Sequence, residues 1–298
     1  MKRDFLTLQD ISHNEFEWIL NKASEIKKSH FPEAAPLRGK SIGLLFEQPS
    51  TRTRVSFEVG IYQLGAQSIY LNQTETQLSR QESVEDTARV LSRYLNGLVI
   101  RTVSHERLES FAKNSTIPVI NGLTSLHHPC QALADMLTIE EKLGTLEGRK
   151  LAYLGDSNNV ANSLIEATSM LGVHMNIACP KNYEPDSEIS QRAIDKGMLR
   201  VVHDPQEAAK EADILYTDVW ISMGQENEEE KISTFKRFQI NKESLAVAKP
   251  DAIVLHCLPA HLGSEITHDV LYSCQSVVFD QAENRLHVQK ALMELIIA

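Results

Sequence analysis

The chain has 298 residues, a mass of 33.5 kDa and 42% hydrophobic residues, which is enough for two domains with a core each. Its formal net charge of -10 excludes a broadly basic surface for nucleic acid or for an anionic membrane, so an anionic ligand has to be bound by a local group of arginines. The four cysteines lack a zinc-binding spacing, and no apolar run suits a membrane span or a signal peptide, so we expect reduced thiols, no structural metal and a cytoplasmic location.

Short apolar runs alternate with segments of helical periodicity, which predicts an α/β protein. An amphipathic helix is expected within residues 5–30, with Ser12 or Asn14 as its cap. Strands are expected next at 42–46, near 66–71, at 98–100 and near 119–122.

The sequence Ser-Thr-Arg-Thr-Arg at 50–54 lies between the first of these strands and a segment of helical periodicity. The first-turn N–H groups of a helix lack intrahelical partners and carry the positive end of the helix dipole. A phosphate at this junction can therefore accept hydrogen bonds from backbone, hydroxyl and guanidinium groups together. The alternative is an ordinary Ser/Thr N-cap followed by two solvated arginines.

Two further features of the first half of the chain are candidates for function. Arg101 ends the strand at 98–100, and ligands of open α/β sheets bind beyond the carboxyl ends of the strands. Arg101 is therefore a second candidate for an anion site, or else a surface arginine. The polar segment 72–83 predicts an exposed loop, which is either functional or merely mobile.

The second half continues the same alternation. A long helical pattern follows His128-Pro129-Cys130-Gln131 and is expected to carry the chain into a second domain. Strands are expected at 150–154, 173–178, 200–203, 214–217 and 252–256, with helices at 160–171 and 283–297. The turn at 155–159 lacks the glycine pattern of dinucleotide-binding proteins, and the acidic run 226–230 is expected to be a solvated loop.

Five separated motifs occur in a fixed order along the chain. They are Ser50-Thr51-Arg52-Thr53-Arg54, His128-Pro129-Cys130-Gln131, Asp218-Val219-Trp220-Ile221-Ser222-Met223-Gly224, His256-Cys257-Leu258-Pro259 and Ala282-Glu283-Asn284-Arg285. In this order they resemble the aspartate/ornithine carbamoyltransferase family over essentially the full length of the chain. The first two motifs are similar to the carbamoyl-phosphate half that the family shares, and the third and fourth to the ornithine-specific half.

The resemblance implies a carbamoyl-phosphate-binding domain at 1–138, completed by the C-terminal helix 280–298, and an ornithine-binding domain at 139–279. Both are expected to be doubly wound α/β domains with mainly parallel sheets, with the active site in the cleft between them. The implied reaction transfers the carbamoyl group of carbamoyl phosphate to the δ-amine of L-ornithine and gives L-citrulline and phosphate. It belongs to arginine metabolism, in the biosynthetic direction by expectation, and needs neither a metal nor an organic cofactor.

The carbamoyl-phosphate ligands that the resemblance implies are Ser50, Thr51, Arg52, Thr53, Gln77, Arg101, His128, Gln131, Cys257, Leu258 and Arg285. Residues 50–53 hold the phosphate, Arg101 and His128 face the carbonyl oxygen, and Gln131 receives the amide. A histidine before proline is otherwise more often structural. In the family, Gln77 reaches the carbamoyl phosphate of a neighbouring subunit, which implies a homotrimer, or a higher assembly of trimers, with shared active sites.

The ornithine ligands that the resemblance implies are Asn159, Asp218, Ser222 and Met223, with Asp218 accepting from the α-ammonium. Only a neutral δ-amine is a nucleophile, and the pKa of such an amine in solution is near the lysine value of about 10.4. Cys257 could orient this amine or take part in its deprotonation, or be a small buried hydrophobe. The implied catalytic residues are Arg52, Thr53, Arg101 and His128, which stabilise a tetrahedral oxyanion, together with Cys257.

Two rival functions stay open on the sequence alone. A transferase that acts on putrescine would not need to recognise an α-carboxylate, and Ser222-Met223-Gly224 favours the amino acid. A non-catalytic protein that binds small anions or amino acids would lack a ligand residue, and every residue that the resemblance requires is present.

Overall fold

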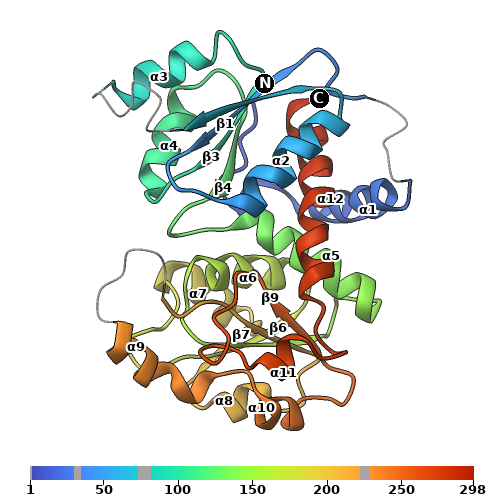
Figure 1. Cartoon of the computed structure of the whole chain (residues 1–298), viewed down its shortest axis with the longest axis vertical. Coiled ribbons are helices and arrows are strands. Elements are labelled where there is room, and N and C mark those ends of the chain that lie inside the picture. The colour runs from blue at the N-terminus through green and yellow to red at the C-terminus, as the bar shows by residue number, and fades with distance from the viewer. Residues whose placement is uncertain (1, 30–34, 73–81, 222–227) are drawn as a thin grey trace. The chain divides into compact units, whose positions relative to one another are not determined.

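The computed structural model describes residues 2–29, 35–72, 82–221 and 228–298 (Figure 1). The chain divides into two compact units, one formed by residues 1–137 with 283–298 and the other by residues 138–282. It passes from the first unit to the second within α5 (Pro129–Leu143) and returns within α12 (Val278–Ile297). Among the described helices, none combines the length and the apolar character that crossing a bilayer requires.

The first unit contains a parallel sheet of β1 (Ser41–Phe46), β2 (Gln67–Asn72), β3 (Gly97–Arg101) and β4 (Val119–Leu123), in the order β2-β1-β3-β4. The chain first adds β2 on one side of β1 and then β3 and β4 on the other. The sheet order therefore reverses between β1 and β3, where parallel sheets bind their ligands at the carboxyl ends of the strands.

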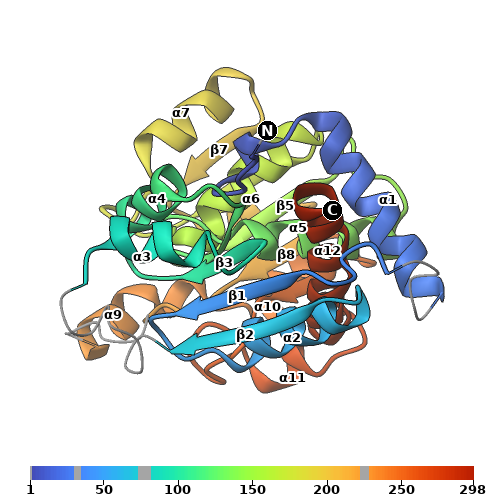
Figure 2. The same cartoon turned by 90° about the horizontal axis from the view of Figure 1, so that it is seen from above.

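Helices cover both faces of this sheet (Figure 2). On one face, α3 (Val84–Leu91) and α4 (His105–Asn114) bury an apolar cluster against β3, with Leu98 and Phe111 fully buried. On the other face, α2 (Thr51–Gln63) lies beside α12, and a Cβ added at Gly60 would lie only 3.3 Å from Cγ of Lys290. The close approach of these two helices explains a glycine in the middle of α2.

The N-terminal helix α1 (His13–Ser29) begins with a reciprocal cap. The Oγ of Ser12 accepts from the Glu15 N–H at 3.3 Å, and the Glu15 carboxylate accepts from the Ser12 N–H at 2.8 Å. Of the two caps that the sequence offers, the structure uses Ser12.

The second unit contains a parallel sheet with the order β7-β6-β5-β8-β9, which reverses between β5 and β8. Its strands are β5 (Lys150–Leu154), β6 (His174–Ala178), β7 (Leu199–Val202), β8 (Ile214–Thr217) and β9 (Ile253–His256). Its helices are α6 (Asn159–Met170), α7 (Ser187–Asp195), α8 (Pro205–Ala209), α9 (Glu228–Phe235), α10 (Lys242–Val247) and α11 (His268–Leu271). Among the described residues, 3-10 turns lie at Leu8–Asp10 in the first unit and at Lys236–Phe238 in the second.

The fold class expected from the sequence is confirmed, since both units have parallel sheets flanked by helices. Two predicted elements differ. Part of the acidic run 226–230 belongs to α9, because Lys231 forms an ion pair with Asp156 and Phe235 is fully buried. The last helix begins at Val278 rather than near 283, because Val278 is itself buried in the core of the second unit.

Candidate active site

The first half of the candidate site lies at the sheet reversal of the first unit. The Ser50 side chain accepts from the Thr53 N–H at 3.3 Å and so caps α2. Thr53 itself is buried, and its Oγ1 accepts from Arg285 Nη2 at 3.2 Å and from Arg101 Nη1 at 3.4 Å. One threonine hydroxyl thus holds two guanidinium groups from distant parts of the chain.

Arg285 is fixed in this position by a second hydrogen bond. Its Nη1 donates to Gln131 Oε1 at 2.7 Å, and Gln131 Nε2 donates in turn to Asp135 Oδ1 at 2.8 Å. Gln131 and Asp135 lie one turn apart on α5, and both are buried. The chain of contacts orients the Arg285 side chain before any ligand is bound.

His128 lies beside these arginines, with Nε2 at 3.5 Å from Arg285 Nη1. Burial lowers the pKa of His128 well below its usual value, and the positive charges of Arg285, Arg101 and Arg52 lower it further. The imidazole is therefore neutral near pH 7, so it can donate a hydrogen bond from one ring nitrogen but cannot supply a cationic acid.

The two arginines of the Ser-Thr-Arg-Thr-Arg motif differ in their surroundings. Arg52 is exposed in the first turn of α2, and its charge acts on His128. Arg54 pairs with Glu58 at 3.0 Å and stacks over the ring of Tyr70 at 3.6 Å. The structure thus contains both features weighed from the sequence, an N-cap at Ser50 and a cluster of arginines around Thr53.

Sequence reasoning missed Glu47, which follows β1 directly. Its carboxylate accepts from Arg107 Nε on α4 at 2.6 Å and from the Thr102 hydroxyl just after β3, while its N–H donates to the Arg101 carbonyl oxygen at 2.9 Å. Glu47 therefore ties together the carboxyl ends of β1 and β3. A charged residue immediately after a buried apolar strand was the available signal.

The thiol of Cys130 in the His-Pro-Cys-Gln motif is structural. It is fully buried, its sulfur lies 3.4 Å from the Asn121 carbonyl oxygen, and burial raises its pKa to about 12. A thiol of this kind stays protonated at neutral pH and is not a nucleophile.

The second half of the candidate site lies at the sheet reversal of the second unit. Asp218 follows β8, Cys257 follows β9, and Asn158 follows β5, so three neighbouring strands bring them together. The Cys257 thiol donates to Asp218 Oδ1 at 2.9 Å, and Asn158 Nδ2 donates to Asp218 Oδ2 at 2.7 Å. Each carboxylate oxygen of Asp218 thus has one protein donor and keeps capacity for another.

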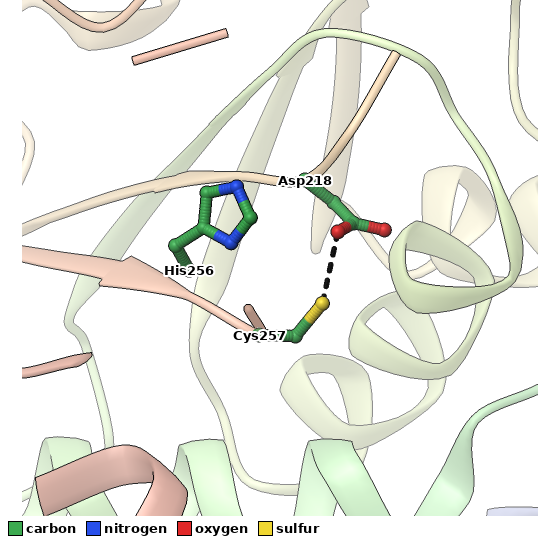
Figure 3. A group of neighbouring side chains, drawn as sticks. All are labelled: Asp218, His256 and Cys257. Carbon is green, nitrogen blue, oxygen red and sulfur yellow. Dashed lines mark hydrogen bonds between the residues drawn. The ribbon is translucent and has the colours of Figure 1, made fainter. Parts of the chain in front are cut away.

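Asp218, His256 and Cys257 together have the residue types of a metal site, and one ligand atom from each lies within 4.8 Å of the others (Figure 3). The ring of His256 is, however, already engaged at both nitrogens. Its Nδ1 accepts from the Leu258 N–H at 2.9 Å, and its Nε2 contacts Glu265 Oε1 at 3.1 Å. His256 therefore orients the turn that follows β9, where Leu258 has a positive φ of 56° and precedes a cis proline.

Asn159, which the resemblance names as an ornithine ligand, is the first residue of α6 and lies next to Asn158. The neighbouring Asn158, which the resemblance does not name, donates to Asp218. The sequence pattern alone does not predict that Asn158 contacts Asp218, because this contact follows from the position of Asn158 as the cap of α6.

An ion pair near this half of the site was also missed. Lys231 Nζ lies 2.6 Å from Asp156 Oδ2, and the ammonium lies 5.6 Å from the ring centroids of both Tyr183 and Phe235. Burial raises the pKa of Asp156, and the lysine acts against this shift. The partners are far apart in sequence, so only the fold could reveal the pair.

Gln77, Ser222 and Met223 lie outside the described residues. Within the described part of the chain, Thr53, Arg101, His128, Gln131 and Arg285 come together in one unit, with Ser50, Thr51 and Arg52 in the adjoining turn. Asp218, Cys257 and Leu258 come together in the other, in the turns after β8 and β9.

Two family models match the chain. The carbamoyl-phosphate-binding domain of aspartate/ornithine carbamoyltransferase matches residues 3–141, and the aspartate/ornithine-binding domain matches residues 147–296. The chain is 52% identical over 302 residues to the ornithine carbamoyltransferase of Syntrophus aciditrophicus, covering 100% of both chains. It is 52% identical to that of Thermococcus kodakarensis over 303 residues, covering 99% of this chain and 96% of the relative.

Solved structures of ornithine carbamoyltransferases are similar to this chain over nearly its full length. The ornithine carbamoyltransferase of Pyrococcus furiosus superposes with a TM-score of 0.94 at 49% identity, over 99% of this chain and 97% of the other. The anabolic ornithine carbamoyltransferase of Campylobacter jejuni superposes with a TM-score of 0.93 at 41% identity, over 99% of both chains.

Proposed function

The chain belongs to the aspartate/ornithine carbamoyltransferase family, and on that premise we propose that it transfers the carbamoyl group of carbamoyl phosphate to the δ-amine of L-ornithine. The products are L-citrulline and phosphate. The observation that carries this proposal is the convergence of Arg101, Arg285 and His128 around Thr53, beside the capped start of α2.

The first unit supplies what a small phosphorylated carbamate needs. The first turn of α2, with Ser50, Thr51, Arg52 and Thr53, offers backbone, hydroxyl and guanidinium donors to the phosphate. Arg101 and the neutral His128 donate to the carbonyl oxygen, and the amide of Gln131 receives the carbamoyl NH2. Arg285, on α12, adds a third guanidinium. These assignments follow the motif match, and the contacts of Arg101 and Arg285 with Thr53 support them.

The second unit supplies the recognition of ornithine. The Asp218 carboxylate is held by Cys257 and Asn158 and accepts from the α-ammonium of the substrate. Asn159, Ser222 and Met223 bind the rest of the amino-acid head by similarity to the family. Cys257 and the Leu258 backbone serve the carbamoyl group, so the turn after β9 contributes to both substrates.

The chemical step is attack of the neutral δ-amine on the carbamoyl carbon, followed by expulsion of phosphate. Charge develops on the carbonyl oxygen in the tetrahedral intermediate, and donors fixed in advance stabilise it without reorganisation. Arg52, Thr53, Arg101 and His128 take this role. The low pKa of His128 means that it donates a neutral hydrogen bond, so the positive charge at the oxyanion comes from the arginines.

The direct test measures phosphate release and the ureido product from carbamoyl phosphate with each of three acceptors, the product being citrulline when the acceptor is ornithine. We expect turnover with L-ornithine that exceeds turnover with putrescine and L-aspartate by at least about a hundredfold, because putrescine lacks the α-carboxylate and L-aspartate lacks the δ-amine. Preferred use of putrescine would contradict the assigned acceptor. Absence of product with all three would contradict the enzyme assignment.

The finer assignments are an anabolic role in arginine biosynthesis, a cytoplasmic location and a homotrimer with shared active sites. The anabolic enzyme of Campylobacter jejuni among the similar structures supports the first. An exposed apolar stripe of Val55, Val59 and Tyr62 on α2 supports a subunit interface. Light scattering is expected to give three times the 33.5 kDa chain mass, and a monomer mass would contradict the trimer.

A further inference from the structure

One side chain, that of Asn158, connects helix α6 to the Asp218 carboxylate. Its Oδ1 accepts from the N–H groups of Val160 at 2.9 Å and Ala161 at 3.4 Å, which makes it the N-cap of α6. Because backbone N–H groups only donate, the atom facing them has to be the oxygen. The amide NH2 therefore points the other way, where it donates to Asp218 Oδ2 at 2.7 Å.

The surroundings of Asn158 restrict its movement further. The Tyr153 hydroxyl donates to the Asp156 carbonyl oxygen at 2.9 Å and lies 3.3 Å from Asn158 Oδ1. Burial raises the pKa of Tyr153 well above its usual value, so the hydroxyl keeps its proton. Its ring stacks on that of Tyr216 at a centroid distance of 5.7 Å. The Tyr153 hydroxyl, whose ring is packed against Tyr216, thus contacts the Asn158 amide oxygen.

We infer that Asn158 is a positioning residue for ornithine, because it fixes the plane of the Asp218 carboxylate through one oxygen while Cys257 holds the other. This inference rests on the proposed role of Asp218 toward the α-ammonium. A carboxylate that is oriented in advance loses less freedom when the substrate binds. The helix cap and the substrate contact are thereby coupled through a single amide.

Two substitutions separate the cap from the contact. Asn158→Asp and Asn158→Ser both keep a good N-cap side chain, and both remove the NH2 donor that faces Asp218. The aspartate also sets a like charge against Asp218. We expect the KM for ornithine to rise about ten- to a hundredfold in both variants, the usual cost of losing a hydrogen bond to a charged group. The KM for carbamoyl phosphate should stay within about twofold.

The matched control is Asn241, which caps α10 in the same unit. Its Oδ1 accepts from the Ser244 N–H at 3.1 Å, and the hydrogen bonds of its side chain run to Ser244 and not to Asp218. Asn241→Asp and Asn241→Ser should leave both KM values unchanged. If the Asn158 and Asn241 variants shifted ornithine KM equally, the effect would be one of general stability, and the positioning role would be overturned.

A thermodynamic cycle with Asp218→Asn distinguishes this inference from the proposed function. If Asn158 acts through Asp218, the double variant Asn158→Ser/Asp218→Asn should have the ornithine KM of Asp218→Asn alone, within about threefold. A rise in KM with Asp218→Asn but none with Asn158→Ser or Asn158→Asp would overturn the inference and leave the function intact. Absence of citrulline formation by the unmodified protein would overturn the function instead.

Discussion

Arg52, Arg101 and Arg285 place three positive charges around the buried imidazole of His128. The positive field lies in a chain with a net charge of -10, so it is local and results from the fold. Arg101 and Arg285 are held by Thr53, whereas Arg52 is exposed at the first turn of α2. At the scale of single residues, catalysis should therefore depend on Arg52 while stability should not.

Replacing Arg52 by alanine tests this distinction. We expect kcat to fall about 10²- to 10³-fold, the typical cost of one donor to a developing oxyanion, with a melting temperature close to that of the unmodified protein. The control is Arg89→Ala, since the Arg89 side chain is 63% exposed and its contacts with Asp86 and Asn114 are long, at 3.4 Å each. A kcat for Arg52→Ala within threefold of the Arg89→Ala value would remove Arg52 from the mechanism.

His128 gives a prediction for stability rather than rate. Its pKa in the unfolded chain is near 6.5, and burial lowers the folded value well below that. As the pH falls below about 6.5, the unfolded state binds a proton at His128 that the folded state does not. The contribution of His128 to the free energy of unfolding is therefore fully present above that pH and decreases on acidification. His128→Asn should make the free energy of unfolding less dependent on pH between 6.5 and 5, by up to about 1.4 kcal/mol per pH unit.

Urea titrations of both proteins at several pH values measure this slope. The exposed His174, replaced by asparagine, controls for the loss of a histidine as such. Equal slopes in the unmodified protein and in His128→Asn would show that His128 is not buried as a neutral group.

At the scale of elements, both halves of the candidate site lie where the sheet order reverses, between β1 and β3 and between β5 and β8. The carboxyl ends of adjacent parallel strands meet there, so residues distant in sequence come within hydrogen-bond reach. In the first unit Glu47 links these ends to α4 through Arg107. The arrangement of Arg101 should depend on that link, because Glu47 also binds its backbone.

Glu47→Gln should therefore affect stability and substrate binding together. We expect the free energy of unfolding to fall by about 1–3 kcal/mol, because Arg107 loses a charged partner in a partly buried place. The KM for carbamoyl phosphate should rise severalfold, while the KM for ornithine should not change. Glu109→Gln is the control, since that side chain is 59% exposed. Unchanged carbamoyl-phosphate KM in a destabilised Glu47→Gln protein would restrict Glu47 to a structural role.

Sequence patterns predicted the elements better than the contacts between them. Parallel strands are buried on both faces and appear as continuous apolar runs, which is why β8 was found at its observed bounds, Ile214–Thr217. Arg101 was identifiable because it ends such a run. Asn158, Lys231 and Glu47 were not, because their importance depends on partners on other elements. The acidic run 226–230 likewise has the composition of a loop, and the ion pair between Lys231 and Asp156 that accompanies α9 is not visible in the sequence.

At the scale of the whole molecule, the proposed function assigns carbamoyl phosphate mainly to residues of the first unit and ornithine to residues of the second, and the proposed trimer adds Gln77 from a neighbouring subunit. A shared site makes a specific prediction for mixed assemblies. An Arg52→Ala subunit is defective in its own site, whereas a Gln77→Ala subunit is defective in the site of its neighbour. In a hybrid trimer, a site with Arg52 from one variant and Gln77 from the other is complete.

Mixing the two inactive variants should therefore restore citrulline formation. For random assembly from equal amounts of dissociated subunits, about a quarter of the sites combine two intact residues, so activity should recover to about a quarter of the unmodified value. Each variant dissociated and reassembled alone is the control and should stay inactive. Recovery no greater than the sum of the two separate variants would mean that each subunit builds its site unaided, and Gln77 would then have no role across a subunit boundary.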